Sequence, residues 1–208
     1  MNGPANNFSW ADMAYWALMA VCIVTVIVVL ARAWVAYFRS DRTKAKIHKL
    51  LRKLGALRHW KVLSNVEVTE GGDTAALDHV VVAPWGVMLF QDIHAKGCYY
   101  GKMDDDMWVC TDGEEESTKR EPAKNPGKDC QKALVILRRL FAKESIYSMQ
   151  VEYFVPTTGK HVTNYVSGSQ EIILNPKELR ERLSRMKYDK DNGVDIEKVA
   201  ALFVSQKK

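Results

Sequence analysis

The pattern of apolar residues divides the chain into two unlike parts. Residues 13–31 (MAYWALMAVCIVTVIVVLA) contain no charged side chain. As a helix that rises about 1.5 Å per residue, this run spans about 28 Å, close to the ~30 Å hydrocarbon core of a bilayer. After residue 39, apolar and polar positions alternate at helix or strand spacing. The pattern predicts a short tail over 1–12, a transmembrane helix over 13–38 and a folded domain after it.

The apolar run has two other interpretations. A buried core helix is disfavoured because the run has no polar face to show to water. A cleaved signal peptide is suggested by Ala31-Arg32-Ala33, which resembles a small-x-small cleavage site. The stretch before the run, however, holds Asp12 and no Lys or Arg, and the run is longer than the ~7–15 residues of the apolar h-region of a signal peptide. A single membrane anchor is therefore the prediction.

The charges that flank the run predict its orientation. Residues 39–61 carry nine Lys and Arg against one acid, Asp41, whereas residues 1–12 carry only Asp12. Positive flanks stay in the cytoplasm, so we expect a single-pass cell-membrane protein with its N-terminus outside and residues 39–208 inside. The basic stretch is explained as a topogenic signal near anionic headgroups, and a contact with nucleic acid is the open alternative.

The rest of the chain alternates between helical and strand patterns. Residues 43–58 have an amphipathic helical pattern, and residues 111–128 are polar and proline-bearing, as in a surface loop. Strands are expected at 60–68, 76–83, 87–93, 98–100, 107–110, 151–155 and 171–174, and further helices at 129–143, 176–187 and 195–204. This order predicts an α/β fold with a mixed β-sheet flanked by helices, comprising a domain over 39–190 and a C-terminal helix within 191–208.

Composition narrows the classes of protein that fit. The chain is 47% hydrophobic and has 30 Lys and Arg against 25 Asp and Glu, a net charge of +5, which excludes a disordered chain and permits an anionic partner. The four cysteines form no CxxC pair, so a structural zinc site is not expected. In a reducing cytoplasm the cysteines of the folded domain are expected to be free thiols.

Two neighbouring strands carry polar residues where an apolar core is expected. Asp78 lies in the first half of the strand at 76–83, and the strand at 87–93 contains Gln91 and Asp92. Residues 91 and 93, at positions i and i+2 of the second strand, share one face of that strand. Their side chains can therefore meet Asp78 of the neighbouring strand. Two carboxylates there hold a hard divalent cation, and a nearby lysine assists the attacking water.

This arrangement resembles the core of the PD-(D/E)XK nucleases. The stretch Leu77–Gly101 (LDHVVVAPWGVMLFQDIHAKGCYYG) is similar to the NERD, or nuclease-related, domain of that superfamily, and the likeness covers about residues 43–185. The positions in register are Asp78-His79, Gly86, Lys96-Gly97, Tyr100-Gly101, Trp108 and Asn125-Pro126. The resemblance implies a restriction-endonuclease-like core and a nuclease site that uses Mg²⁺ or Mn²⁺.

The sequence departs from the family pattern where the chemistry would occur. The family's E-x-K aligns with Gln91-Asp92-Ile93, so an amide replaces the metal-binding carboxylate and an isoleucine replaces the lysine. Asp78, Gln91 and Lys96 are therefore remnant catalytic positions, and Asp78 alone is a weak metal ligand. Asp92, His94 or Lys96 could substitute, but in a regular strand Asp92 and His94 project to the face opposite residue 91.

One helix of the domain presents a basic surface. Lys128, Lys132, Arg138 and Arg139 lie on or just before the outer side of the helix predicted at 129–143, together with Lys143. In an active relative such a surface could contact DNA phosphates. A solvated helix face is the simpler interpretation.

Three functional hypotheses follow. The leading one is a membrane-anchored NERD-like pseudoenzyme that binds nucleic acid or a protein partner in the cytoplasm and needs no cofactor. The second is an active nuclease with a rearranged site, and only this hypothesis requires Mg²⁺ or Mn²⁺. The third is a structural subunit of a membrane complex, in which the fold is only a scaffold.

Overall fold

The computed structural model describes residues 10–112, 119–158 and 162–204. The chain divides into two compact units, residues 1–42 and 43–208. Helix α1 (Trp10–Arg58) begins in the first unit and ends in the second. Both helical segments, predicted at 13–38 and 43–58, fall within the bounds of α1.

The apolar part of α1 is exposed wherever its side chains are described, at Trp16 and over residues 18–32. Leu18 and Val21, for example, are 68% and 65% exposed. Among the helices with described side chains, no stretch is both long and apolar enough to cross a membrane. The predicted span therefore finds no support there; residues 13–15, 17 and 33–38 of that span lie outside the described side chains.

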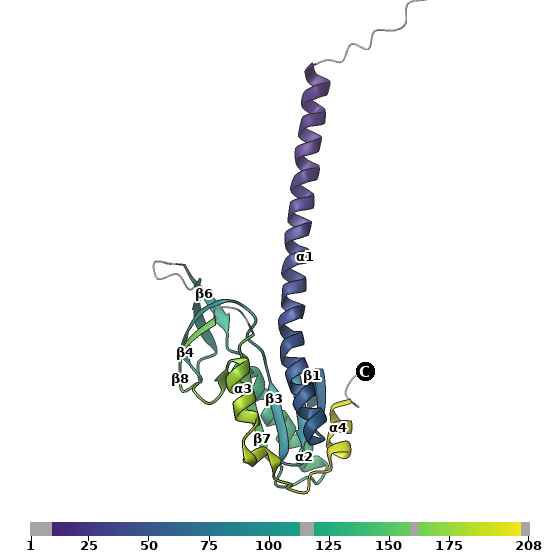
Figure 1. Ribbon diagram of the computed structural model, residues 1–208, viewed down its shortest axis with the longest axis vertical. Coiled ribbons are helices and arrows are strands. Elements are labelled where there is room, and N and C mark those ends of the chain that lie inside the picture. Colours follow the sequence, from purple (N-terminus) through teal and green to yellow (C-terminus); the bar gives the residue numbers. More distant parts are fainter. Residues whose placement is uncertain (1–9, 113–118, 159–161, 205–208) are drawn as a thin grey trace, which may run out of the picture. The chain divides into compact units, whose positions relative to one another are not determined.

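The main sheet has the strand order β1-β2-β3-β7-β9, and β1, β3 and β7 of this sheet are labelled in Figure 1. It consists of β1 (Lys61–Glu70), β2 (Asp73–Ala83), β3 (Gly86–Phe90), β7 (Val151–Pro156) and β9 (Ile173–Leu174). The first three strands are antiparallel, and β7 and β9 continue the sheet in parallel. The predicted mixed sheet is confirmed. β3 is fully buried, as expected for a central strand that is apolar on both faces.

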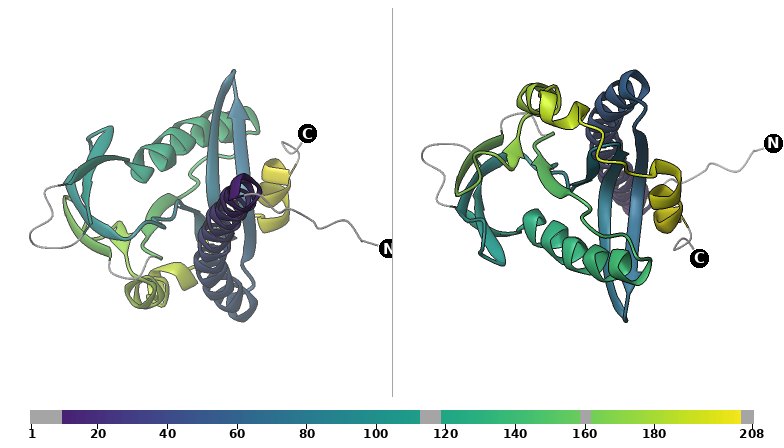
Figure 2. Two further views of the ribbon diagram at one scale, coloured as in Figure 1. Left: turned by 90° about the horizontal axis from the view of Figure 1, so that it is seen from above. Right: turned by 90° about the horizontal axis from the view of Figure 1, so that it is seen from below.

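Helices cover both faces of this sheet (Figure 2). One face packs against α2 (Pro126–Lys143) and α4 (Ile196–Val204) through side chains such as Leu137 and Phe203. The other face packs against residues 47–54 of α1 and against α3 (Pro176–Leu183). The result is the predicted arrangement of a mixed sheet flanked by helices.

A second sheet, with the order β6-β5-β4-β8, lies across the domain from strands β1 and β2 (Figure 2). It consists of β4 (Gly97–Lys102), β5 (Met107–Thr111), β6 (Arg120–Lys124) and β8 (Val162–Ser167). The strands predicted at 98–100 and 107–110 are confirmed, and they form the antiparallel pair β4–β5. The prediction of a surface loop over 111–128 is wrong at residues 120–124, which form β6. The sequence pattern does not predict β8. Both strands are rich in polar residues and join the sheet through backbone pairing.

Helix α2 begins earlier than predicted, at Pro126 with Asn125 as its N-cap, rather than at Asp129. Asn125 is fully buried, and its Oδ1 accepts a hydrogen bond from the N–H of Gly127 over 2.9 Å. Its Nδ2 donates to the carbonyls of Met103 and Asp105, at 2.9 and 2.7 Å. One side chain therefore starts the helix and ties it to the β4–β5 connection.

The C-terminal helices follow the prediction with one break. The helix predicted at 176–187 ends at Leu183, and a separate 3₁₀ turn, η1 (Met186–Asp189), follows it. Asn175 and Glu178 form a capping box at the start of α3. The last helix begins at Ile196, next to the predicted cap Asp195, whose Oδ1 accepts from the N–H of Lys198.

Candidate metal centre at the end of β3

The pairing of β2 with β3 ends at His79 and Phe90. Beyond that pair, Gln91 and Ile93 donate their N–H groups to Phe154 and Pro156 of β7, so the chain stays beside β7. On the other side, the N–H of Asp92 donates to Oδ2 of Asp78 over 3.0 Å. The carboxylate of Asp78 therefore takes the place of a backbone partner where the two strands part.

This placement brings Asp78, Asp92 and His94 together. One potential ligand atom from each residue lies within 4.8 Å of the other two. Nε2 of His94 is 3.8 Å from Oδ2 of Asp78. The Asp92 side chain is fully buried, and those of Asp78 and His94 are 10% and 24% exposed. Two carboxylates and an imidazole are ligands that divalent cations accept.

In a regular strand Asp92 and His94 would project to the face opposite residue 91, but β3 ends at Phe90 and both residues lie close to Asp78. Asp92 does lie near His79, as strand alternation predicts, with its Oδ2 3.7 Å from Nε2 of His79. The Asp78 carboxylate, however, is within reach of these residues because it fills the gap at the end of the β2–β3 pairing. Alternation predicts the face of a side chain, and it does not predict where two strands separate.

A hydrogen bond of Thr158 fixes the ring of His94. The Thr158 hydroxyl donates its proton to the carbonyl of Ile93 over 3.1 Å. The same oxygen lies 2.9 Å from Nδ1 of His94 and must accept there, so Nδ1 carries the hydrogen. In the neutral imidazole this leaves the lone pair on Nε2, the atom that faces Asp78. That is the tautomer a metal ligand needs.

A chain of polar side chains reaches the centre from α1. Nδ1 of His48 lies 2.7 Å from Oγ of Ser64, which lies 3.0 Å from Nδ1 of His79. His79 in turn faces Asp92. Burial, and secondarily the charge of Arg52, lowers the pKa of His48 and favours its neutral form.

The buried thiol of Cys130, in the first turns of α2, has its pKa raised mainly by burial. The negative charges of Asp129, Asp78 and Asp92 add to that effect. Cys130 is therefore a protonated, apolar neighbour of the cluster and not a thiolate ligand.

The remnant positions have structural roles. Oε1 of Gln91 accepts the N–H of Asp78 over 3.3 Å, and Ile93 is buried in an apolar cluster with Tyr99 and Val155. Lys96 is exposed just before β4. Of the predicted catalytic positions, Asp78 and Gln91 thus lie together. The sequence offers Asp92 and His94 only as substitutes, although both are metal-binding residue types two positions apart at a strand end.

The predicted basic surface of α2 is partly neutralised. Nζ of Lys128 lies 3.5 Å from a carboxylate oxygen of Asp106, and Arg139 pairs with Asp73 at 2.7 Å. Lys132 and Arg138 are exposed. The four residues lie on one element as predicted, but two of them have acidic partners that reduce the field available to a phosphate.

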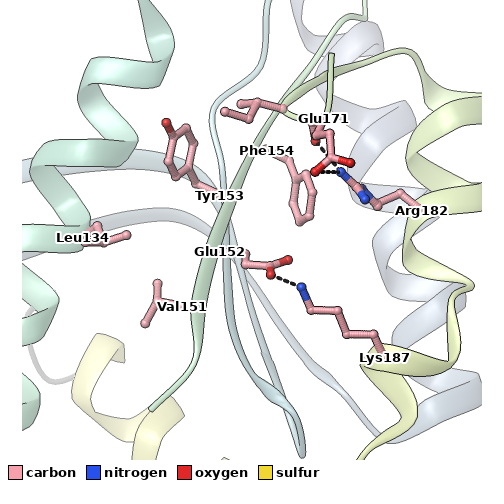
Figure 3. Close-up of a pocket in the computed structure, with 9 residues that line it drawn as sticks. Leu134, Val151, Glu152, Tyr153, Phe154, Glu171, Arg182 and Lys187 are labelled. Carbon is pink, nitrogen blue, oxygen red and sulfur yellow. Dashed lines mark hydrogen bonds and ion pairs between the residues drawn. The ribbon is translucent and has the colours of Figure 1, made fainter. Parts of the chain in front are cut away.

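A cleft of about 250 Å³ lies elsewhere, between β7 and the helices α2 and α3 (Figure 3). Its charged residues pair with each other: Arg182 with Glu171 at 3.0 Å, and Lys187 with Glu152. Neither Asp78, Asp92 nor His94 lines it. Because its charges are already paired, the cleft is a weaker candidate for chemistry than the cluster at the end of β3.

Comparison with known proteins gives one match. Residues 40–158 match the family model of the nuclease-related domain, NERD. This range contains Asp78, Asp92, His94 and Thr158. Searches of curated proteins and of solved structures gave no match.

Proposed function

Since the chain belongs to the nuclease-related domain (NERD) family, we propose that residues 43–208 form a divalent-metal-dependent nuclease domain with a rearranged centre. In this proposal the metal ligands are Asp78, Asp92 and His94. The observation that carries it is the convergence of their three ligand atoms within 4.8 Å of one another. The substrate class, a nucleic acid phosphodiester, is taken from the family.

The chain's own residues would prepare this centre. The N–H of Asp92 holds the Asp78 carboxylate in place, and Thr158 presents the lone pair of His94 Nε2. A divalent ion bound there would polarise the phosphoryl oxygen and lower the pKa of a bound water. The His94 side chain is 24% exposed, so solvent reaches this edge of the cluster.

A second candidate function is nucleic acid or protein binding without cleavage. It is favoured by the replacements at the E-x-K positions, where Gln91 and Ile93 cannot supply a charge or a proton. The buried Ile93 also leaves no room for a lysine at its position without repacking. Under this interpretation the contacts of Asp78 with His94 and of Asp92 with His79 only stabilise the fold.

Nicking of supercoiled plasmid by the full chain, in Mg²⁺ or Mn²⁺ and in EDTA, distinguishes the two. We expect metal-dependent nicking that Asp92→Asn and His94→Asn each abolish. Asp104→Asn and His59→Asn are matched controls at exposed positions outside the cluster. Nicking that survives both cluster variants would contradict the proposal, and folded protein that binds DNA but never nicks it would favour the second function.

We further propose that the apolar part of α1 anchors the protein in the cell membrane, with the basic flank and the domain in the cytoplasm. The supporting observations are the exposed apolar side chains at 18–32 and the lysines and arginines that follow them. Full-length protein should then resist alkaline extraction from membranes, and external protease should spare residues 43–208. Docking of this helix onto a membrane-protein partner would instead make the protein extractable once that partner is removed.

A further inference from the structure

The open face of the second sheet carries exposed aromatic and aliphatic side chains. Alternate residues such as Tyr99 and Trp108 point into a buried cluster. On the other face, Tyr100, Val109 and Tyr165 are 42%, 41% and 56% exposed. A sheet face covered by helix or sheet would bury such side chains, so this face is available to a partner.

These side chains form a row across all four strands. Tyr100 of β4 pairs with Tyr165 of β8 on one side and with Val109 of β5 on the other, and Val109 pairs with Pro122 of β6. The rings of Tyr100 and Tyr165 are stacked, with centroids 4.9 Å apart and planes 11° from parallel. Each ring therefore keeps one flat face that the other ring does not cover.

The charges on this face favour an anion. Strand positions on the same side as Tyr100 include Lys102, Arg120 and Lys124. Lys124 is bound to Asp129, at 2.7 Å, whereas Lys102 and Arg120 are exposed. Within the described strand residues that share this side, none is Asp or Glu. An aromatic row between basic side chains is complementary to bases joined by phosphates.

The two tyrosine-bearing strands both start next to the candidate metal centre. β4 begins three residues after His94, and β8 follows Thr158, which is hydrogen-bonded to His94. At about 3.3 Å per residue, the six residues from His94 to Tyr100 span at most ~20 Å. Tyr100 therefore lies within a few nucleotides' length of the candidate centre.

We propose that this face binds unpaired bases of single-stranded nucleic acid, with Tyr100 and Tyr165 as the stacking platform and Lys102 and Arg120 as phosphate contacts. This inference rests on the proposed function, from which it takes the ligand to be a nucleic acid. The inference adds that the protein holds its substrate by stacking against the bases. The bases of a duplex are stacked on one another and are not accessible to the tyrosines. The domain would accordingly prefer single strands, gaps or flaps to intact duplex.

The test uses fluorescence anisotropy of a labelled oligothymidine and of a matched duplex, with the detergent-solubilised full chain in EDTA. Leucine replaces Tyr100 and Tyr165, because it keeps the apolar surface and removes the aromatic face. Tyr147→Leu is the control, since Tyr147 is 74% exposed and lies between α2 and β7. Folding of each variant is verified by its thermal transition.

We expect the double variant to lose about tenfold or more of its affinity for the single strand, with duplex affinity and Tyr147→Leu unchanged. Equal single-strand affinity in all folded forms would overturn the inference. The inference would also be overturned if the double variant changed only its oligomeric state, as measured by sedimentation. That result would identify the face as an interface between copies of the chain. Because EDTA excludes metal chemistry, failure of this test leaves plasmid nicking unaffected, and failure of nicking leaves this test unaffected.

Discussion

Asp78 and Asp92 are joined by a hydrogen bond in which the backbone N–H of Asp92 donates to Oδ2 of Asp78 over 3.0 Å. The bond closes the gap where β3 leaves β2 and sets two buried carboxylates side by side. Two such charges repel each other unless cations or protons offset them. Here each carboxylate faces an imidazole, His94 at 3.8 Å from Asp78 and His79 at 3.7 Å from Asp92.

The polar chain from α1 predicts a pH effect on stability. The pKa of His48 is lowered in the folded protein, so below about pH 6.5 the unfolded state binds more protons at this residue. Its contribution to stability is therefore present at neutral pH and is lost as pH falls. His48→Gln should flatten the decrease in the urea midpoint between pH 7 and pH 5, and His59→Asn should not. An unchanged slope in His48→Gln would contradict this assignment.

Asn125 should be the most sensitive helix cap. Asn125→Ala removes three hydrogen bonds of a fully buried side chain and leaves the carbonyls of Met103 and Asp105 without that donor. We expect a loss of about 2–4 kcal/mol in the free energy of unfolding. Asn175→Ala, at the exposed cap of α3, should cost only ~1 kcal/mol. Chemical denaturation compares the two, and equal losses would show that Asn125 acts only as a cap.

Gly97 should not tolerate a side chain. Its φ is +137°, and a Cβ at this position would lie 2.4 Å from the backbone oxygen of Thr111 in the neighbouring strand. Gly97→Ala should therefore disrupt the pairing of β4 with β5 and destabilise the fold by several kcal/mol. Gly71 also has a positive φ, +64°, but this lies in the αL region and no atom would meet its Cβ, so Gly71→Ala should cost only about 1 kcal/mol. Similar unfolding midpoints for the two variants would refute the steric argument.

The basic residues of α2 should differ in their effect on duplex DNA binding. Lys132→Glu and Arg138→Glu change exposed side chains, whereas Arg139→Glu changes one that already pairs with Asp73. We expect the first two each to weaken binding and to lower the slope of affinity against salt by about one. Arg139→Glu should have a smaller effect on both. Salt titrations of the Kd measure this, and identical slopes for all forms would remove α2 from the DNA-binding surface.

The main sheet could be predicted because its central strands are apolar on both faces and are bounded by turn residues. β2 and β3 have this pattern, and Gly71-Gly72 separates β1 from β2. Strands β6 and β8 could not be predicted from the sequence. Their sequences, REPAK and VTNYVS, adopt a strand conformation because their backbones pair with other strands. Propensity carries little information about such strands.

The candidate centre was predictable only in part for a related reason. Asp78 stands out as a carboxylate within a buried strand. Asp92 and His94 join it because the β2–β3 pairing stops at His79 and Phe90. That end point depends on the pairing of β3 with β7, a parallel strand some sixty residues away in sequence. The alternation of polar and apolar residues therefore gives the face of each side chain and not the distance between them.

Binding of Mn²⁺ to the metal-free full chain, measured by isothermal titration calorimetry, tests the central claim most directly. We predict one Mn²⁺ per chain, with affinity at least tenfold lower in Asp92→Asn and in His94→Asn and unchanged in Asp104→Asn and His59→Asn. The ion should also raise the thermal midpoint of the wild-type chain but not those of the two cluster variants. Absence of binding, or binding that both cluster variants retain, would contradict a metal centre formed by Asp78, Asp92 and His94.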